Sequence, residues 1–377
     1  MAMDLVAERR HRTLLPHALA VLYGVAIAYA SLQPFTPWIA PAEGTPFWPF
    51  AAWPLRWTRF DVLANVLAYV PFGLFVALTP RRASPATRAV YAMSVGITLS
   101  FGLETLQMFL PSRDASLIDL AANTAGTLAG AMLAAIVVRS EHTRIALSAI
   151  RHRAFLPGML GDIGLALLVV WLAAQINPGI PLFAVTFDPD MVPAALAAAD
   201  SAARPDRAAV AIEAAQSALQ MTGVGLFLVL LLRDRRTIGG AILLLIGAAL
   251  LVKGVSAALL LKPALWDTWL KPGVSIGVAA GLLALLCIVF LPRPVQLAAC
   301  ATALLASLLL PVVVSDFPPT RASLTLFSWR YGHLLNFNGL TQSMLLAWPL
   351  AVAAWLFVLA GRPGWGDPRE QRANAPL

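Results

Sequence analysis

Long apolar runs separated by short polar turns follow one another along the chain. Ten runs are long enough to cross about 30 Å of hydrocarbon at about 1.5 Å per residue. They cover residues 14–33, 60–79, 87–110, 116–138, 156–176, 214–232, 237–261, 272–291, 294–314 and 340–361. The pattern predicts an all-α fold, a polytopic transmembrane helix bundle with about ten transmembrane helices.

Composition and charge agree with membrane residence. Hydrophobic residues make up 59% of the chain and charged residues only 12%, too few charges to cover a soluble core. The net charge of +8 is spread over the turns between the runs, which is typical of topology signals and not of a nucleic-acid interface. Alternating sides put 17 basic residues with both termini and nine on the other side, so both termini are expected in the cytoplasm.

The first run also allows a second interpretation. Arg9–Arg12, an apolar stretch and Ala28–Ala30 stand in the order of a cleaved signal peptide. The stretch of about 17 apolar residues is long for such a signal, which favours a retained helix. Cleavage would remove one helix without inverting the others.

The longer connections fall on the external side. Residues 34–59 combine Trp, Phe and Pro with little charge, as in a stretch that lies among lipid head groups or forms an ordinary aromatic belt. Residues 177–213 predict a short helical cap or a loop. Residues 315–339 form a third external segment, with polar residues Tyr331, His333, Asn336 and Asn338.

The second half of the chain offers few chemical features. It contains no Walker loop, HExxH, GxSxG or cysteine pair. Cys287 and Cys300 both lie in apolar runs, where we expect them to be packed and buried. Lys253 is the one cation inside a span, and we interpret it either as a functional lysine or as a side chain that snorkels to the outer surface.

Polar and ionisable side chains gather in the second, third and fourth runs. Such side chains cost several kcal/mol inside a bilayer, so their positions are informative. Each run carries them as a single helical stripe: Asp61 and Asn65; then Gly96, Ser100, Glu104 and Gln107; then Asp119, Asn123, Gly126 and Gly130. The two glycines of the third stripe predict close approach of a neighbouring helix.

The stripes reach the same depth. Asn65, Glu104 and Asn123 each lie about 8–10 Å from the outer end of their run, below the turn that holds Arg113. Three carboxylates could share Arg113 as a counter-charge. The predicted outer-leaflet binding site consists of Asp61, Asn65, Glu104, Gln107, Arg113, Asp119 and Asn123. The alternative is that these residues only hold the helices together, as buried polar contacts do.

The same stretches resemble the VanZ-like membrane protein family. They are Asp61–Asn65 with Val70–Gly73, Glu104–Gln107, Pro111–Arg113, and Asp119–Gly126 with Gly130. The resemblance covers roughly residues 14–140 and implies a four-helix membrane domain, residues 1–150, linked to the bacterial envelope. Low-level teicoplanin resistance belongs to the founding member. That member lacks the domain of about six helices expected at residues 151–377.

Taken together, these features predict a multi-pass protein of the bacterial cytoplasmic membrane. We expect it to bind or shield a lipid-linked envelope precursor or a glycopeptide, with membrane lipids as partners and no nucleic acid. No cofactor or metal is expected, because the five histidines are scattered away from the carboxylates. Three alternatives stay open: an intramembrane enzyme with Glu104 as base and Arg113 as anion partner, a transporter, and a structural partner of another envelope protein. The absence of a catalytic motif favours binding, and the absence of an internal repeat weighs against a transporter.

Overall fold

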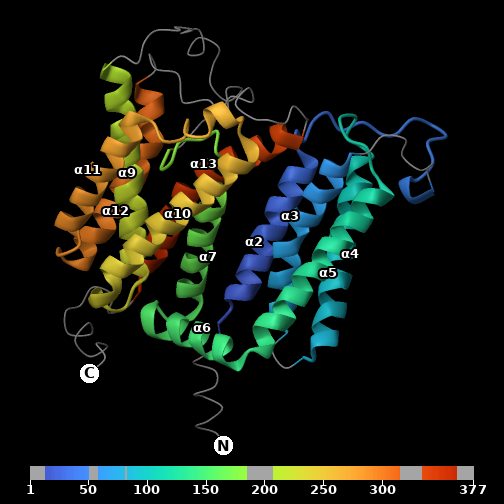
Figure 1. Cartoon of the computed structure of the whole chain (residues 1–377), viewed down its shortest axis with the longest axis horizontal. Coiled ribbons are helices and arrows are strands. Elements are labelled where there is room, and N and C mark those ends of the chain that lie inside the picture. The colour runs from blue at the N-terminus through green and yellow to red at the C-terminus, as the bar shows by residue number, and fades with distance from the viewer. Residues whose placement is uncertain (1–12, 51–57, 81–82, 185–206, 315–332, 363–377) are drawn as a thin grey trace, which may run out of the picture. The chain divides into compact units, whose positions relative to one another are not determined.

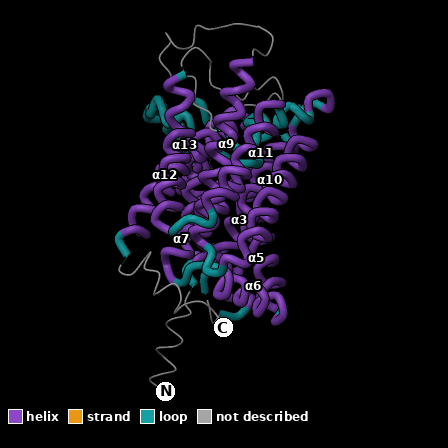
Figure 2. The backbone as a smooth tube through the Cα atoms, turned by 90° about the vertical axis from the view of Figure 1, so that its left-hand side faces the viewer, coloured by secondary structure: helices purple, strands orange, loops and turns teal. Residues whose placement is uncertain are grey.

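The structure is a computed structural model that describes residues 13–50, 58–80, 83–184, 207–314 and 333–362. Within these ranges it contains eleven α-helices, a few 3-10 turns and no strand, which confirms the all-α prediction (Figure 2). The chain divides into two compact units, unit 1 at residues 1–151 and unit 2 at residues 152–377. The basic stretch Arg9–Arg12 and most of the segments 177–213 and 315–339 lie outside the described residues.

Unit 1 consists of four apolar helices and one short amphipathic helix (Figure 1). The apolar helices are α2 (Leu15–Leu32), α3 (Arg59–Leu78), α4 (Pro85–Gln107) and α5 (Leu117–Arg139). Each begins and ends within three residues of its predicted run. All four are long and apolar enough to cross a membrane.

Side-chain caps fix where these helices begin. Thr58 and Asp61 form a capping box at α3, in which each side chain accepts the other residue's backbone N–H. Ser84 caps α4, and Pro85 occupies its first turn. Ser116 accepts the N–H of Ile118 at the start of α5. The apolar runs set the length of each span, and the caps set the residue at which it starts.

Helix α6 (Glu141–Ala154) was not predicted; it follows α5 after a single residue, Ser140. Figure 1 shows this helix turning away from the end of α5. Its exposed side chains mix Ile145, Leu147 and Ile150 with basic residues, the composition of a helix that lies along a membrane surface.

Unit 2 contains the six helices predicted after residue 156. They are α7 (Gly158–Ala174), α9 (Arg207–Leu231), α10 (Ile238–Leu260), α11 (Pro272–Ile288), α12 (Arg293–Val313) and α13 (His333–Ala360). Helices α9, α10, α12 and α13 are long and apolar enough to span, whereas α7 and α11 are shorter apolar helices of 17 residues. About ten membrane helices therefore remains a consistent description.

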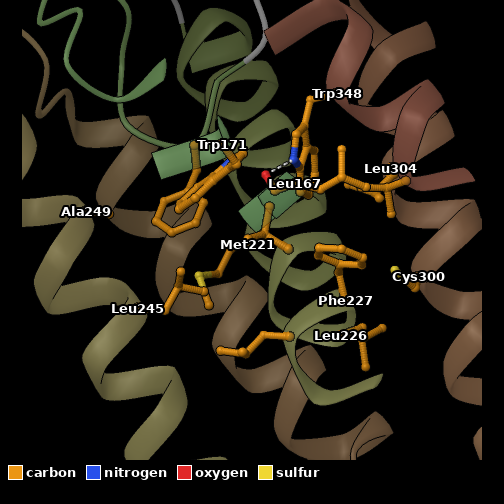
Figure 3. Close-up of a cluster of buried hydrophobic side chains, with 14 of the residues drawn as sticks. Leu167, Trp171, Met221, Leu226, Phe227, Leu245, Ala249, Cys300, Leu304 and Trp348 are labelled. Atoms are coloured by element: carbon orange, nitrogen blue, oxygen red, sulfur yellow. Dashed lines mark hydrogen bonds between the residues drawn. The ribbon is translucent and has the colours of Figure 1, made fainter. Parts of the chain in front are cut away.

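Helix α9 forms the centre of unit 2. From Met221 to Leu231 every residue of α9 is buried, which is expected of a helix that is apolar on all sides. Figure 3 shows Met221, Leu226 and Phe227 among side chains of the surrounding helices. Beside them the indole N–H of Trp348 in α13 donates to the carbonyl of Leu167 in α7 at 2.7 Å. The neighbouring helices thus enclose α9 on all sides.

Two expectations about unit 2 are wrong in part. Cys300 is buried, but Cys287 is exposed on α11. Lys253 does not snorkel outward, since its side chain is fully buried. Its ammonium donates to the carbonyls of Asn177 at 2.7 Å and Ile180 at 3.0 Å.

Those carbonyls belong to a buried loop, residues 175–184, that follows α7. The side-chain amide of Asn177 donates to Asn338 and Thr341 of α13 at 2.7 and 2.8 Å. Asn338, from the segment predicted at residues 315–339, therefore makes a contact inside unit 2. Irregular backbone at membrane depth requires such partners, because lipid offers none.

Candidate functional site

Close packing of α3, α4 and α5 positions the polar residues of unit 1. A Cβ added at Gly126 or Gly130 of α5 would collide with the backbone carbonyls of Val66 and Val70 in α3. A Cβ at Gly96 of α4 would lie 2.5 Å from the Thr127 hydroxyl of α5. The predicted close approach at Gly126 and Gly130 is confirmed, and it leaves the polar stripes facing one another.

The predicted site residues lie at two levels of burial. Glu104 and Gln107 of α4 and Asn123 of α5 are buried, with 3, 9 and 5% of their surfaces exposed, and Ser100 of the same α4 stripe is fully buried. Asp61, Asn65, Arg113 and Asp119 are half-buried. The stripe predicted on α4 is therefore confirmed as an inward face.

Most of the half-buried residues serve contacts between or within helices. Asp61 is the third residue of α3 and forms the capping box with Thr58. Asn65 of α3 donates to the Asp119 carboxylate of α5 at 2.7 Å. The first contact fixes the start of α3. The second joins α3 to α5, which is the role expected of an interhelical hydrogen bond.

Arg113 binds the end of α2. Its guanidinium donates to the carbonyls of Ala30 at 2.9 Å and of Gln33 at 2.9 and 3.1 Å. Cations favour the carbonyl end of a helix. Burial lowers the pKa of Arg113, and Glu104 and Asp119 act in the opposite direction, so the side chain stays charged near neutral pH. The predicted counter-charge is therefore near the carboxylates, but its hydrogen bonds go to the backbone.

Glu104 and Gln107 connect α4 to its neighbours. One oxygen of Glu104 accepts the backbone N–H of Ser116 at 2.8 Å, just before α5 begins. Gln107 donates to the carbonyl of Ser31 at the end of α2 at 3.0 Å. Trp48, from the predicted aromatic segment, donates its indole N–H to Thr105 at 3.1 Å, so this part of the segment packs on α4.

Deeper in unit 1, polar atoms remain without a partner. The Asn123 amide donates to the Ser100 hydroxyl at 2.9 Å, but its oxygen is buried and makes no hydrogen bond. The Tyr69 hydroxyl of α3 is also buried; it interacts with the Ser100 hydroxyl but makes no hydrogen bond of good geometry. Tyr69, Ser100, Glu104 and Asn123 are called the inner polar cluster below. Buried polar atoms in native proteins nearly always have a partner, so these two atoms require an explanation.

Tyr69 and Ser100 were not among the predicted site residues. Tyr69 lies four residues after Asn65, on the same face of α3, and this spacing was the signal that could have found it. Ser100 was part of the α4 stripe and lies one turn from Glu104.

The donor set of the cluster suits a polar organic group better than a metal. Among the described residues no group of three or more His, Cys, Asp or Glu side chains is placed to hold a metal ion. The cluster instead offers two hydroxyls, one amide and one carboxylate, which are hydrogen-bonding groups.

Comparison with known proteins gives one family match. Comparison with curated proteins and with solved structures finds no match. The family model described as VanZ/LLP1 matches residues 14–138, which include α2 to α5 and the whole inner polar cluster. Across that part the chain is similar to the VanZ/LLP1 family, and it continues beyond the match through α6 to α13.

Proposed function

We propose that the chain is a multi-pass protein of the bacterial cytoplasmic membrane with both termini in the cytoplasm. In this proposal unit 1 binds or shields the head group of an amphiphilic envelope component, such as a lipid-linked precursor or a glycopeptide. The charge bias of the turns supports the orientation, which puts Glu104 and the outer end of α4 on the external side. The family match supports the envelope setting.

The unbonded hydroxyl of Tyr69 and the unbonded oxygen of Asn123 carry the proposal. Residues that only join helices bond to one another, as Asn65 and Asp119 do. The inner polar cluster has bonding capacity left over at a depth where water is scarce, and an unpaired buried polar group costs about 1–3 kcal/mol. A bound polar group would remove that cost.

Helix α2 offers a route to the cluster. Ile27 is its only buried residue within the described part of the helix, and Val21 and Val25 are exposed. At its outer end α2 is held by hydrogen bonds from Gln107 and Arg113. We propose that displacement of this end opens the cluster toward the outer leaflet.

A complementation experiment tests the function. The double variant Tyr69→Phe/Glu104→Gln nearly keeps the shape and the size of both side chains but removes one hydroxyl and one carboxyl group. The matched control, Tyr91→Phe/Glu141→Gln, makes the same changes at exposed positions. In a deletion strain we expect the first variant, inserted at normal levels, to lose its effect on susceptibility to teicoplanin and other envelope-active drugs, and the control to keep it. Equal complementation by both would mean that the cluster only joins helices.

A further inference from the structure

The unbonded atoms of the inner polar cluster define what kind of group fits. Tyr69 offers a hydroxyl that can donate and accept, and the Asn123 oxygen can only accept. Ser100 receives the Asn123 amide, but its own proton is not given to a carbonyl of its helix. Thr98 and Thr105 on the same helix do bond a carbonyl four residues back. The Ser100 hydroxyl also interacts with that of Tyr69, so one donor, the Tyr69 proton, and one acceptor, the Asn123 oxygen, remain.

We propose that the inner polar cluster binds a hydroxyl of a neutral head group, such as a sugar or glycerol, and disfavours phosphate. This inference rests on the proposed function and names the chemical class that the site takes.

One hydroxyl oxygen satisfies both unbonded atoms. It can donate its proton to the Asn123 oxygen and accept the Tyr69 proton. The same holds if the Asn123 amide is turned over, because Ser100 can then donate to the amide oxygen and the ligand hydroxyl accepts from the amide nitrogen. A sugar carries several adjacent hydroxyls, so a second one can reach the remaining oxygen of Glu104, one turn away from Ser100.

Charge weighs against a phosphate. The Tyr69 hydroxyl lies within electrostatic range of the Glu104 and Asp119 carboxylates. The nearest cation, Arg113, already gives its hydrogen bonds to the end of α2. An ionised phosphate would therefore enter a buried site whose neighbouring cation is already hydrogen-bonded elsewhere, and it would leave the Asn123 oxygen without a donor.

An ammonium group also fits less well. Its charge would be attracted to Glu104, but it carries donors only and leaves the Tyr69 proton without an acceptor. A hydroxyl is the smallest group that meets both requirements at once.

Binding of defined lipids to the full-length protein tests the inference. The protein is purified in an amine-oxide detergent, because maltoside and glucoside detergents carry the very group in question. Three lipids with identical acyl chains are compared: glucosyl diacylglycerol, phosphatidic acid and phosphatidylethanolamine. Binding is measured by native mass spectrometry and by the rise in Tm, since a ligand that binds the folded state stabilises it.

We expect glucosyl diacylglycerol to bind and to raise Tm, and phosphatidic acid to do neither. Tyr69→Phe should weaken binding of the glucosyl lipid about tenfold, the effect of losing one buried hydrogen bond and leaving its partner unpaired. Tyr91→Phe, the same change at an exposed position of α4, should leave binding unchanged. Competition by free glucose would support the same chemistry and assign it to a soluble sugar.

Two results would overturn the inference in distinguishable ways. Tyr69-dependent binding of phosphatidic acid or phosphatidylethanolamine in preference to the glucosyl lipid would refute the hydroxyl class and leave the proposed function standing. Absence of any Tyr69-dependent lipid binding, together with a higher Tm of the Tyr69→Phe variant, would refute both. In that case the hydroxyl of Tyr69 is an unsatisfied group or is met by a trapped water.

Discussion

Replacement of Gly130 by Ala tests the packing on which the candidate site depends. The added Cβ would lie 2.6 Å from the Leu74 nitrogen of α3, about 0.8 Å inside the 3.4 Å of ordinary contact. It would also meet the Val70 carbonyl, so no flexible side chain can give way and the helices themselves must separate. Overpacking of this kind costs about 1–3 kcal/mol, and the rigid backbone on both sides places Gly130→Ala near about 3 kcal/mol.

Gly102→Ala on α4 is the matched control, because nothing lies within 4 Å of its added Cβ. There the higher helix propensity of Ala should stabilise the protein by up to about 1 kcal/mol. Unfolding in increasing mole fractions of SDS, followed by circular dichroism, measures both variants. The opposite signs are the prediction, and equal effects of the two substitutions would refute the account of close packing between α3 and α5.

Substitutions at three further residues separate structural from binding roles. Glu104→Ala should destabilise the protein by about 1–3 kcal/mol in the same SDS assay, because the Ser116 N–H loses its acceptor. Glu104→Gln keeps an acceptor and should unfold like the parent protein. Equal stability of the two variants would refute the role of Glu104 as the acceptor for Ser116. Arg113→Ala should speed amide hydrogen exchange at the outer end of α2 and not in α5, and unchanged exchange would contradict its role as a clamp. Lys253→Met should destabilise the protein by about 2 kcal/mol, because two buried carbonyls lose their hydrogen-bond donor. A gain in stability would mean that the desolvation cost of the buried ammonium exceeds the stabilisation from its hydrogen bonds.

The ten membrane helices were predictable because a span must be apolar for its whole length. The starts of α3, α4 and α5 follow from Thr58, Ser84 and Ser116, which are ordinary capping residues. Helix α6 was not predicted, since its apolar residues are interrupted by charges and resemble a polar turn between two spans. The polar stripe of α4 was predicted from its spacing alone.

The partners of the basic residues could not be predicted. Arg88, Arg113 and Arg293 all donate to backbone carbonyls near the ends of helices, and Lys253 donates to carbonyls of a loop. Every residue carries a carbonyl, so no sequence pattern marks such a partner. These arginines therefore look like topology signals in the sequence, and the shared counter-charge for three carboxylates was the natural but incomplete interpretation.

The loop that follows α7 also constrains the order in which unit 2 can assemble. The carbonyls of Asn177 and Ile180 precede their partner Lys253 by 76 and 73 residues. The side chain of Asn177 precedes its partners in α13 by 161 and 164 residues. During synthesis the loop carbonyls therefore gain their partner only after α10 has been made. The Asn177 side chain gains its partners only after the last helix has been made. A nascent chain halted between these two helices would hold a half-completed unit that quality-control proteases can recognise.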